Sequence, residues 1–128
     1  MIGCDQVLYH AGEILHKPAD RAALTRQITR LSGDSHALHV GMVLVSGEIV
    51  LAECVDTARL AMRNLTPEQI ALYCDLAGDK ALASVGGYAL EGAGIHLFET
   101  VEGAHATILG LPLLPLLAQL RRLGKLAL

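Results

Sequence analysis

Aromatic side chains are scarce in this sequence, which has three tyrosines, one phenylalanine and no tryptophan. Proteins that bind single-stranded nucleic acid by stacking need several aromatic platforms. An excess of positive charge is also missing, since the formal net charge is −3. Binding along a nucleic-acid polymer needs clustered Lys and Arg to neutralise phosphates. We therefore expect no nucleic-acid polymer as a partner.

Cysteines are few and widely spaced, at Cys4, Cys54 and Cys74. Their number is odd and no CxxC pair occurs, which argues against a disulfide framework or a zinc site. Each is better explained as a small buried apolar residue. This usage is typical of a reducing compartment, so we expect a cytoplasmic protein.

Long apolar runs are absent as well. The most apolar window, residues 106–120, is shorter than the roughly 20 residues that span a membrane, and it contains Pro112 and Pro115. We interpret it as a helix of the protein core. The first residues show no basic segment followed by an apolar one, so we predict neither a signal peptide nor a membrane partner.

What is present is aliphatic: 52% of the 128 residues are hydrophobic. This content can fill the core of one domain, residues 1–128. A helix is predicted over residues 18–31, because Leu24, Ile28 and Leu31 recur at helical spacing. A nearly continuous apolar strand over 37–45, covered on both faces, turns at 46–47 into a long strand over 49–63.

The second half of the chain repeats the alternation of helices and strands. Thr66 and Gln69 form a capping box that predicts the start of a helix, which should run to about Ala77 and end at Gly78. A strand follows over 95–101, and a well-buried last helix begins between Pro112 and Pro115. Helices and strands mixed in this way predict an α/β or mixed α+β fold with a mixed sheet.

Two places interrupt apolar structure with polar residues. In the first, Asp5, followed by Gln6, sits beside a strand otherwise made of Ile2, Val7 and Leu8. Lys17 precedes a helix start, where free N–H groups favour a phosphate. The alternative is a turn aspartate and a solvated lysine. In the second, Glu91 is the one charge in a glycine-dense loop over 86–94, where backbone can approach a ligand or simply connect two elements.

Histidines give weaker indications. His36 and His39 are three residues apart in a predicted strand, so they point to opposite faces and do not make a metal pair. The other four histidines stand alone in the sequence.

Several blocks of the sequence resemble the Maf family. Residues 2–7 (IGCDQV), 12–18 (GEILHKP) and 31–36 (LSGDSH) resemble the middle of Maf proteins. Residues 87–92 (GYALEG) resemble the second signature, and 102–103 (EG) with 108–113 (ILGLPL) resemble the last one. The blocks span the chain in the family's order, which makes them more specific together than any one alone.

The resemblance implies an elongated mixed sheet flanked by helices, related to inosine triphosphate pyrophosphatase. It implies hydrolysis of a modified or non-canonical nucleoside triphosphate to monophosphate and pyrophosphate. A divalent metal, Mg²⁺ or Mn²⁺, and often a homodimer are also implied. The family's N-terminal strand, Ser- and Arg-rich phosphate loop and first helix have no counterpart in residues 1–128, so a truncated, non-catalytic nucleotide- or partner-binding module is the alternative expectation.

Residue by residue, Asp5 matches the family's catalytic acidic residue and Lys17 its phosphate-contacting lysine. Gln6 and Glu91 fall where the family sets base preference, and this pair resembles the 7-methyl-GTP subgroup. Asp5 and Glu91 are the expected metal ligands. Ser84 stands near a position where many members have lysine.

Overall fold

The computed structural model describes residues 1–128, which form a five-stranded sheet in the order β2-β1-β3-β4-β5. The strands are β1 (Ile2–His10), β2 (Glu13–Leu15), β3 (Ser35–Ser46), β4 (Ile49–Met62) and β5 (Phe98–Glu102). All four pairings are antiparallel. The α+β class is confirmed, but the expectation of a mixed sheet is wrong. Parallel pairing requires a crossover connection, and none of the connections between neighbouring strands is of this kind.

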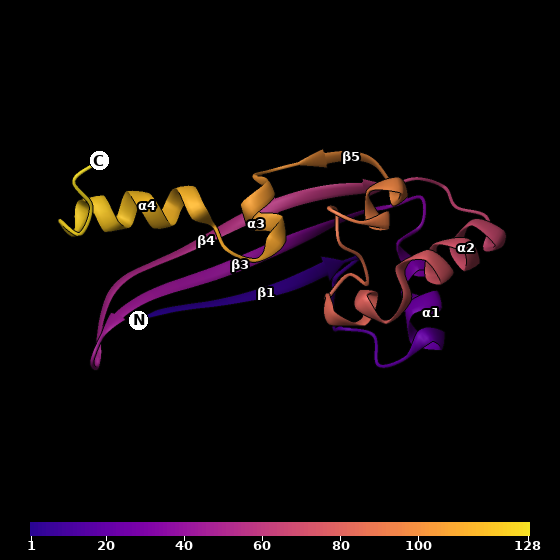
Figure 1. The fold of residues 1–128 in the computed structure, drawn as a ribbon, viewed down its shortest axis with the longest axis horizontal. Coiled ribbons are helices and arrows are strands. Elements are labelled where there is room, and N and C mark those ends of the chain that lie inside the picture. Colours follow the sequence, from indigo (N-terminus) through magenta and orange to yellow (C-terminus); the bar gives the residue numbers. More distant parts are fainter.

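Four α-helices and two 3₁₀ helices flank this sheet. They are α1 (Arg21–Leu31), α2 (Pro67–Ala77), η1 (Gly78–Ala83), η2 (Ala93–Leu97), α3 (His105–Leu109) and α4 (Leu113–Arg122). Figure 1 shows α1 and α2 at one end of the long strands and α4 at the other, near the β3–β4 hairpin. None of the helices combines the length and apolar character needed to cross a membrane.

The helices pack on one face of the sheet. Leu8, Leu38 and Leu60 lie opposite or next to one another on neighbouring strands and are at most 1% exposed beneath α1 and α2. A smaller cluster joins Leu116 of α4 to Met42, Leu44 and Ala52 on the same face. We call this the helix-covered face.

The opposite, open face carries no comparable cover. Tyr9, Val43 and Val55 point to it and are 45%, 36% and 73% exposed. The expectation that the strand at 37–45 is covered on both faces is therefore wrong. Its apolar run reflects one buried face and one face of small or half-exposed residues.

Helix starts depend on caps. The capping box of Thr66 and Gln69 is present and α2 spans Pro67–Ala77, which confirms that prediction. Helix α1 begins later than expected, because the side chain of Asp20 accepts a hydrogen bond from the N–H of Ala23 and caps it there. Its predicted stripe, Leu24, Ile28 and Leu31, is fully buried.

Three predictions in the last third are wrong: the strand over 95–101, the single core helix over 106–120 and the burial of the last helix. Residues 93–97 form η2, and only Phe98–Glu102 is strand, because alternating apolar residues in a short segment do not distinguish a 3₁₀ turn from a strand. The apolar window 106–120 is split, since Gly110 adopts a left-handed φ of 109° after α3 and Pro112 precedes α4. Helix α4 starts where expected, but only Leu116 is buried in it.

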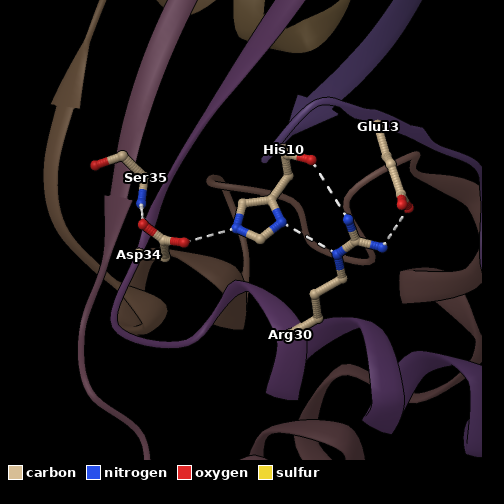
Figure 2. Close-up of polar contacts among 5 residues, drawn as sticks. All are labelled: His10, Glu13, Arg30, Asp34 and Ser35. Atoms are coloured by element: carbon tan, nitrogen blue, oxygen red, sulfur yellow. Dashed lines mark hydrogen bonds and ion pairs between the residues drawn. The ribbon is translucent and has the colours of Figure 1, made fainter.

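A polar network fastens the end of β1 to α1 (Figure 2). Arg30 donates through Nε to His10 Nδ1 at 3.1 Å and through Nη1 to Glu13 Oε2 at 3.0 Å. Because Nδ1 of His10 accepts, its Nε2–H donates to Asp34 Oδ2 at 2.9 Å. This bond, with a second one from the Ser35 N–H, lowers the pKa of the Asp34 carboxyl. The network fixes the strand that carries Asp5 and Gln6.

Candidate functional site

A cavity of about 390 Å³ opens between β1, the segment 83–91 and the end of α3. It brings together all four residues singled out from the sequence: Asp5, Gln6, Lys17 and Glu91. Other lining residues are Cys4, Leu38, Ala83, Ser84, Val85, Gly86, Tyr88, Ala89, Leu90, Ile108, Leu109 and Gly110. Three segments far apart in the sequence therefore meet at one place.

Lys17 reaches the cavity because its neighbour is anchored. Pro18 is buried, and a Cβ built on Gly87 would lie 3.7 Å from its Cγ, so the proline packs beside the glycine loop. Lys17 itself is exposed and is the only Lys or Arg that lines the cavity. Its ammonium group is the cation available to a phosphate there.

The glycines of the loop serve internal packing. A Cβ on Gly86 would lie 2.2 Å from the ring of Tyr88, and one on Gly87, whose φ is +75°, would lie 2.5 Å from Leu24. Of the twenty amino acids, only glycine fits at these two positions without moving a neighbouring side chain. Close approach of backbone to a ligand was the expectation, and Gly86 does line the cavity, but the contacts that exclude a side chain are with Tyr88 and Leu24.

Hydrogen bonds of two buried tyrosines, Tyr73 of α2 and Tyr88 of the loop itself, hold the same loop in place. Tyr88 OH lies 2.6 Å from His36 Nε2, and Tyr73 OH donates to the carbonyl of Gly87 at 2.6 Å. Burial raises the pKa of both hydroxyls, so both stay protonated at neutral pH. Burial also lowers the pKa of His36 to about 4, and the pair is neutral.

The anchored loop determines where the Glu91 side chain lies. Tyr88 and Leu90 are buried, at 5% and 8% exposure, while Ala89 and Glu91 alternate with them and are exposed. The Glu91 carboxylate makes no hydrogen bond or ion pair within the chain. It is thus an acceptor held at the cavity wall and available to a ligand.

Gln6 is held from the other side. Its Nε2 donates to the carbonyls of Ile108 at 2.9 Å and Thr107 at 3.2 Å. Because carbonyls only accept, the NH₂ group must face them and Oε1 must face away. Oε1 has no partner in the chain and is not buried, so Gln6 presents an acceptor to the cavity.

Asp5 stands at the rim. Neighbouring strand residues point to opposite faces, so its side chain lies toward the open face, across the strand from Gln6. It borders both the cavity and a shallow depression on the open face. Strand β2 pairs only with Leu8–His10, so the β1 edge beside Asp5 faces no further strand.

No group of three His, Cys, Asp or Glu side chains is placed to hold a metal ion. A preformed cage is not what Mg²⁺ requires, since it commonly takes one or two carboxylates together with waters and substrate phosphates. Asp5 and Glu91 are the carboxylates that line the cavity, so the donor set fits a hard divalent cation. His36 and His39 point to opposite faces, as predicted, toward Tyr88 and Thr57.

Sequence reasoning missed the groups that hold Gln6. Asp56 Oδ2 accepts a hydrogen bond of 2.6 Å from Thr107 Oγ1, and Thr107 is fully buried. The Gln6 bond to Thr107 spans 101 positions of sequence. Only the strand register, in which Gln6 and Asp56 both lie opposite Val40, could have brought them together.

The family comparison agrees with the motifs. The family model described as Maf-like protein matches residues 1–123.

Similar proteins of known name include a nucleoside triphosphate pyrophosphatase of Nitrobacter winogradskyi. It is 54% identical over 121 residues, which are 94% of this chain and 60% of that protein. The 7-methyl-GTP pyrophosphatase of Mesorhizobium japonicum is 51% identical over 97% of this chain and 62% of its own length. That of Brucella abortus is 48% identical over 95% and 61%. The chain thus spans about three-fifths of the relatives it matches.

Proposed function

The chain belongs to the Maf family, and on that premise we propose that it hydrolyses a nucleoside triphosphate to a monophosphate and pyrophosphate. The observation that carries the proposal is the cavity, which Asp5, Gln6, Lys17 and Glu91 line together. The names of the similar proteins support the same reaction.

Catalysis is assigned to the exposed rim. Water adds to phosphorus, the anhydride bond between the α- and β-phosphates breaks, and pyrophosphate leaves. Asp5 accepts the proton of the attacking water. Lys17 contacts the phosphates and offsets the negative charge that develops on their oxygens. A divalent cation held by Asp5 and Glu91 would supply further charge neutralisation.

Base recognition is assigned to Gln6 and Glu91. Both offer acceptors to the cavity, Oε1 of Gln6 and the Glu91 carboxylate. Guanine carries adjacent N–H donors on its Watson–Crick edge, whereas uracil and thymine carry one N–H between two carbonyls. Two acceptors favour guanine, and a carboxylate also favours the positive ring of 7-methylguanine. The substrate class we propose is therefore 7-methyl-GTP, in the cytoplasm, where three free cysteines stay reduced.

Pyrophosphate release tests the reaction. The purified chain is incubated with Mg²⁺ or Mn²⁺ and 7-methyl-GTP, GTP, UTP, CTP or dTTP. Release should be fastest with 7-methyl-GTP, and Asp5→Asn should reduce it by about 10²-fold or more while the fold is unchanged. Glu91→Gln, which removes a charge but little volume, should narrow the preference for 7-methyl-GTP over GTP.

Retained turnover in Asp5→Asn would contradict the role of Asp5, and an unchanged profile in Glu91→Gln would contradict the assigned specificity. A folded chain that releases no pyrophosphate from any nucleotide would contradict catalysis by these 128 residues and leave a binding module.

A further inference from the structure

The orientation of Gln6 depends on a helix too short to hold itself in place. Helix α3 has five residues, and no side chain caps its N-terminus. A helix of this length has no stability of its own, so its position must come from tertiary contacts. Its last carbonyls are the acceptors for the Gln6 amide. Whatever positions α3 therefore decides how Gln6 faces the cavity.

Ile108 packs α3 into the main core, and a second contact of α3 is polar and directed. Thr107 is 0% exposed, and its Oγ1–H donates to Asp56 Oδ2 at 2.6 Å. Asp56 is itself oriented, because its Oδ1 accepts from the N–H of Thr57 at 3.0 Å. Short hydrogen bonds to a carboxylate are about twice as strong as neutral ones. This one ties α3 to the middle of β4.

The sheet register places Gln6 and Asp56 so that both contact the same residue of α3. Gln6 on β1 and Asp56 on β4 both pair with Val40 of β3, so they lie in one row across the helix-covered face. From this row, Gln6 holds the carbonyl of Thr107 and Asp56 holds its hydroxyl. One residue of α3 is thus fixed from both sides.

We propose that Asp56 and Thr107 are positioning residues for base selection, which hold α3 so that Gln6 turns its Oε1 toward the ligand. This inference rests on the proposed function, because the ligand it concerns is a nucleobase with N–H donors. Without the Thr107 hydroxyl bond, α3 shifts and the Gln6 amide rotates freely. It then offers NH₂ and Oε1 alternately, and the preference for a donor-rich base edge weakens.

The test compares variants at one position. Dissociation constants for 7-methyl-GTP and UTP are measured with the wild-type chain, Thr107→Val, which keeps the shape and loses the hydroxyl, and Thr107→Ser, which keeps the hydroxyl. Thr107→Val should reduce the ratio of the two constants by about fivefold to tenfold, the worth of one hydrogen bond. Thr107→Ser should stay within about twofold of wild type. Asp56→Ala removes the same bond and should match Thr107→Val.

The side-chain amide of Gln6 gives a second readout that needs no nucleotide. In ¹⁵N-labelled wild-type chain, its two protons should exchange slowly with water, because both are hydrogen-bonded. They should exchange fast in Thr107→Val and slowly in Thr107→Ser. A variant that lost only stability would weaken both nucleotides equally and leave this exchange unchanged.

The two proposals fail in different ways. If Thr107→Val and Asp56→Ala keep both the ratio and the slow exchange while Gln6→Leu loses the ratio, the positioning role is overturned and base selection by Gln6 stands. If Gln6→Leu also keeps the ratio, or if no nucleotide binds, the proposed function fails. In that case the exchange measurement alone tests whether Asp56 and Thr107 hold the Gln6 side chain, because it needs no nucleotide.

Discussion

At the residue scale, the buried pair of His36 and Tyr88 holds the loop that forms part of the cavity wall. Their side chains meet at 2.6 Å, and the Tyr88 ring packs edge-on against Phe98 at a centroid distance of 4.7 Å. His36 Nδ1 is buried without a partner. Burial therefore disfavours a second proton, which would charge the ring, so the loop that carries Glu91 depends on a neutral His36.

This dependence predicts a stability loss in mild acid. The pKa of His36 falls from 6.5 to about 4, first through burial and then through the electrostatic effect of nearby His10, against a smaller opposing effect of Asp34. Because the folded-state pKa is below the unfolded one, the unfolded chain binds more protons between pH 6.5 and 4. The free energy of unfolding should therefore fall by about 2–3 kcal/mol as pH decreases through that window.

Urea unfolding across pH 4–7 measures this change, with two variants as controls. His36→Phe should flatten the pH dependence by that amount. Tyr88→Phe removes the same hydrogen bond but keeps the histidine, so it should lose stability at every pH and retain the slope. An equal slope in wild type and His36→Phe would contradict the assignment.

At the element scale, the conformation of the glycine loop depends on packing contacts within the protein, such as that of Gly87 with Leu24. Gly87 and Gly47 both have a positive φ, +75° and +59°, but only Gly87 has neighbours where a Cβ would stand. Gly47→Ala should cost about 1 kcal/mol of stability through backbone strain alone. Gly87→Ala should cost about 2 kcal/mol more, because the new methyl group meets buried Leu24.

Chemical denaturation of the two variants beside wild type measures the difference. Equal losses for Gly87→Ala and Gly47→Ala would show that Leu24 moves aside at little cost, and that the loop is not held by this contact.

Elements with local signals were predictable from the sequence, and those fixed by distant contacts were not. The capping box of Thr66 and Gln69 lies within four residues and predicted the start of α2 correctly, and Gly78 predicted its end. Helix α3 has no side-chain cap, so nothing in its own sequence marks its start. Its position depends on Asp56, which is 51 positions away along the chain.

The same reasoning applies to the site. Asp5, Gln6, Lys17 and Glu91 could be chosen as polar residues in apolar surroundings, and they do line one cavity. Which group Gln6 offers to a ligand could not be predicted, because that follows from the carbonyls of Thr107 and Ile108.

At the scale of the whole molecule, helices cover one face of a long antiparallel sheet, and the cavity opens where that cover is incomplete. The main core lies under α1 and α2 and includes Ile108 of α3, and the small core lies under α4. Figure 1 shows α3 between these two groups of helices. The main-core residues Leu38, Tyr88, Leu90 and Ile108 line the cavity beside Gln6, whereas no residue of the small core does. The site thus lies at the margin of the main core.

We propose that a nucleotide binds in this cavity. Titration of 7-methyl-GTP into the ¹⁵N- and methyl-labelled chain, followed by NMR, is the experiment that locates the binding site. Shift changes should cluster at Asp5, Gln6, Lys17, Ser84–Glu91 and Ile108–Gly110, and the exposed residues Ile49 and Val50 at the β3–β4 hairpin should not change. Changes centred on that hairpin, or none at millimolar nucleotide, would contradict nucleotide binding in this cavity.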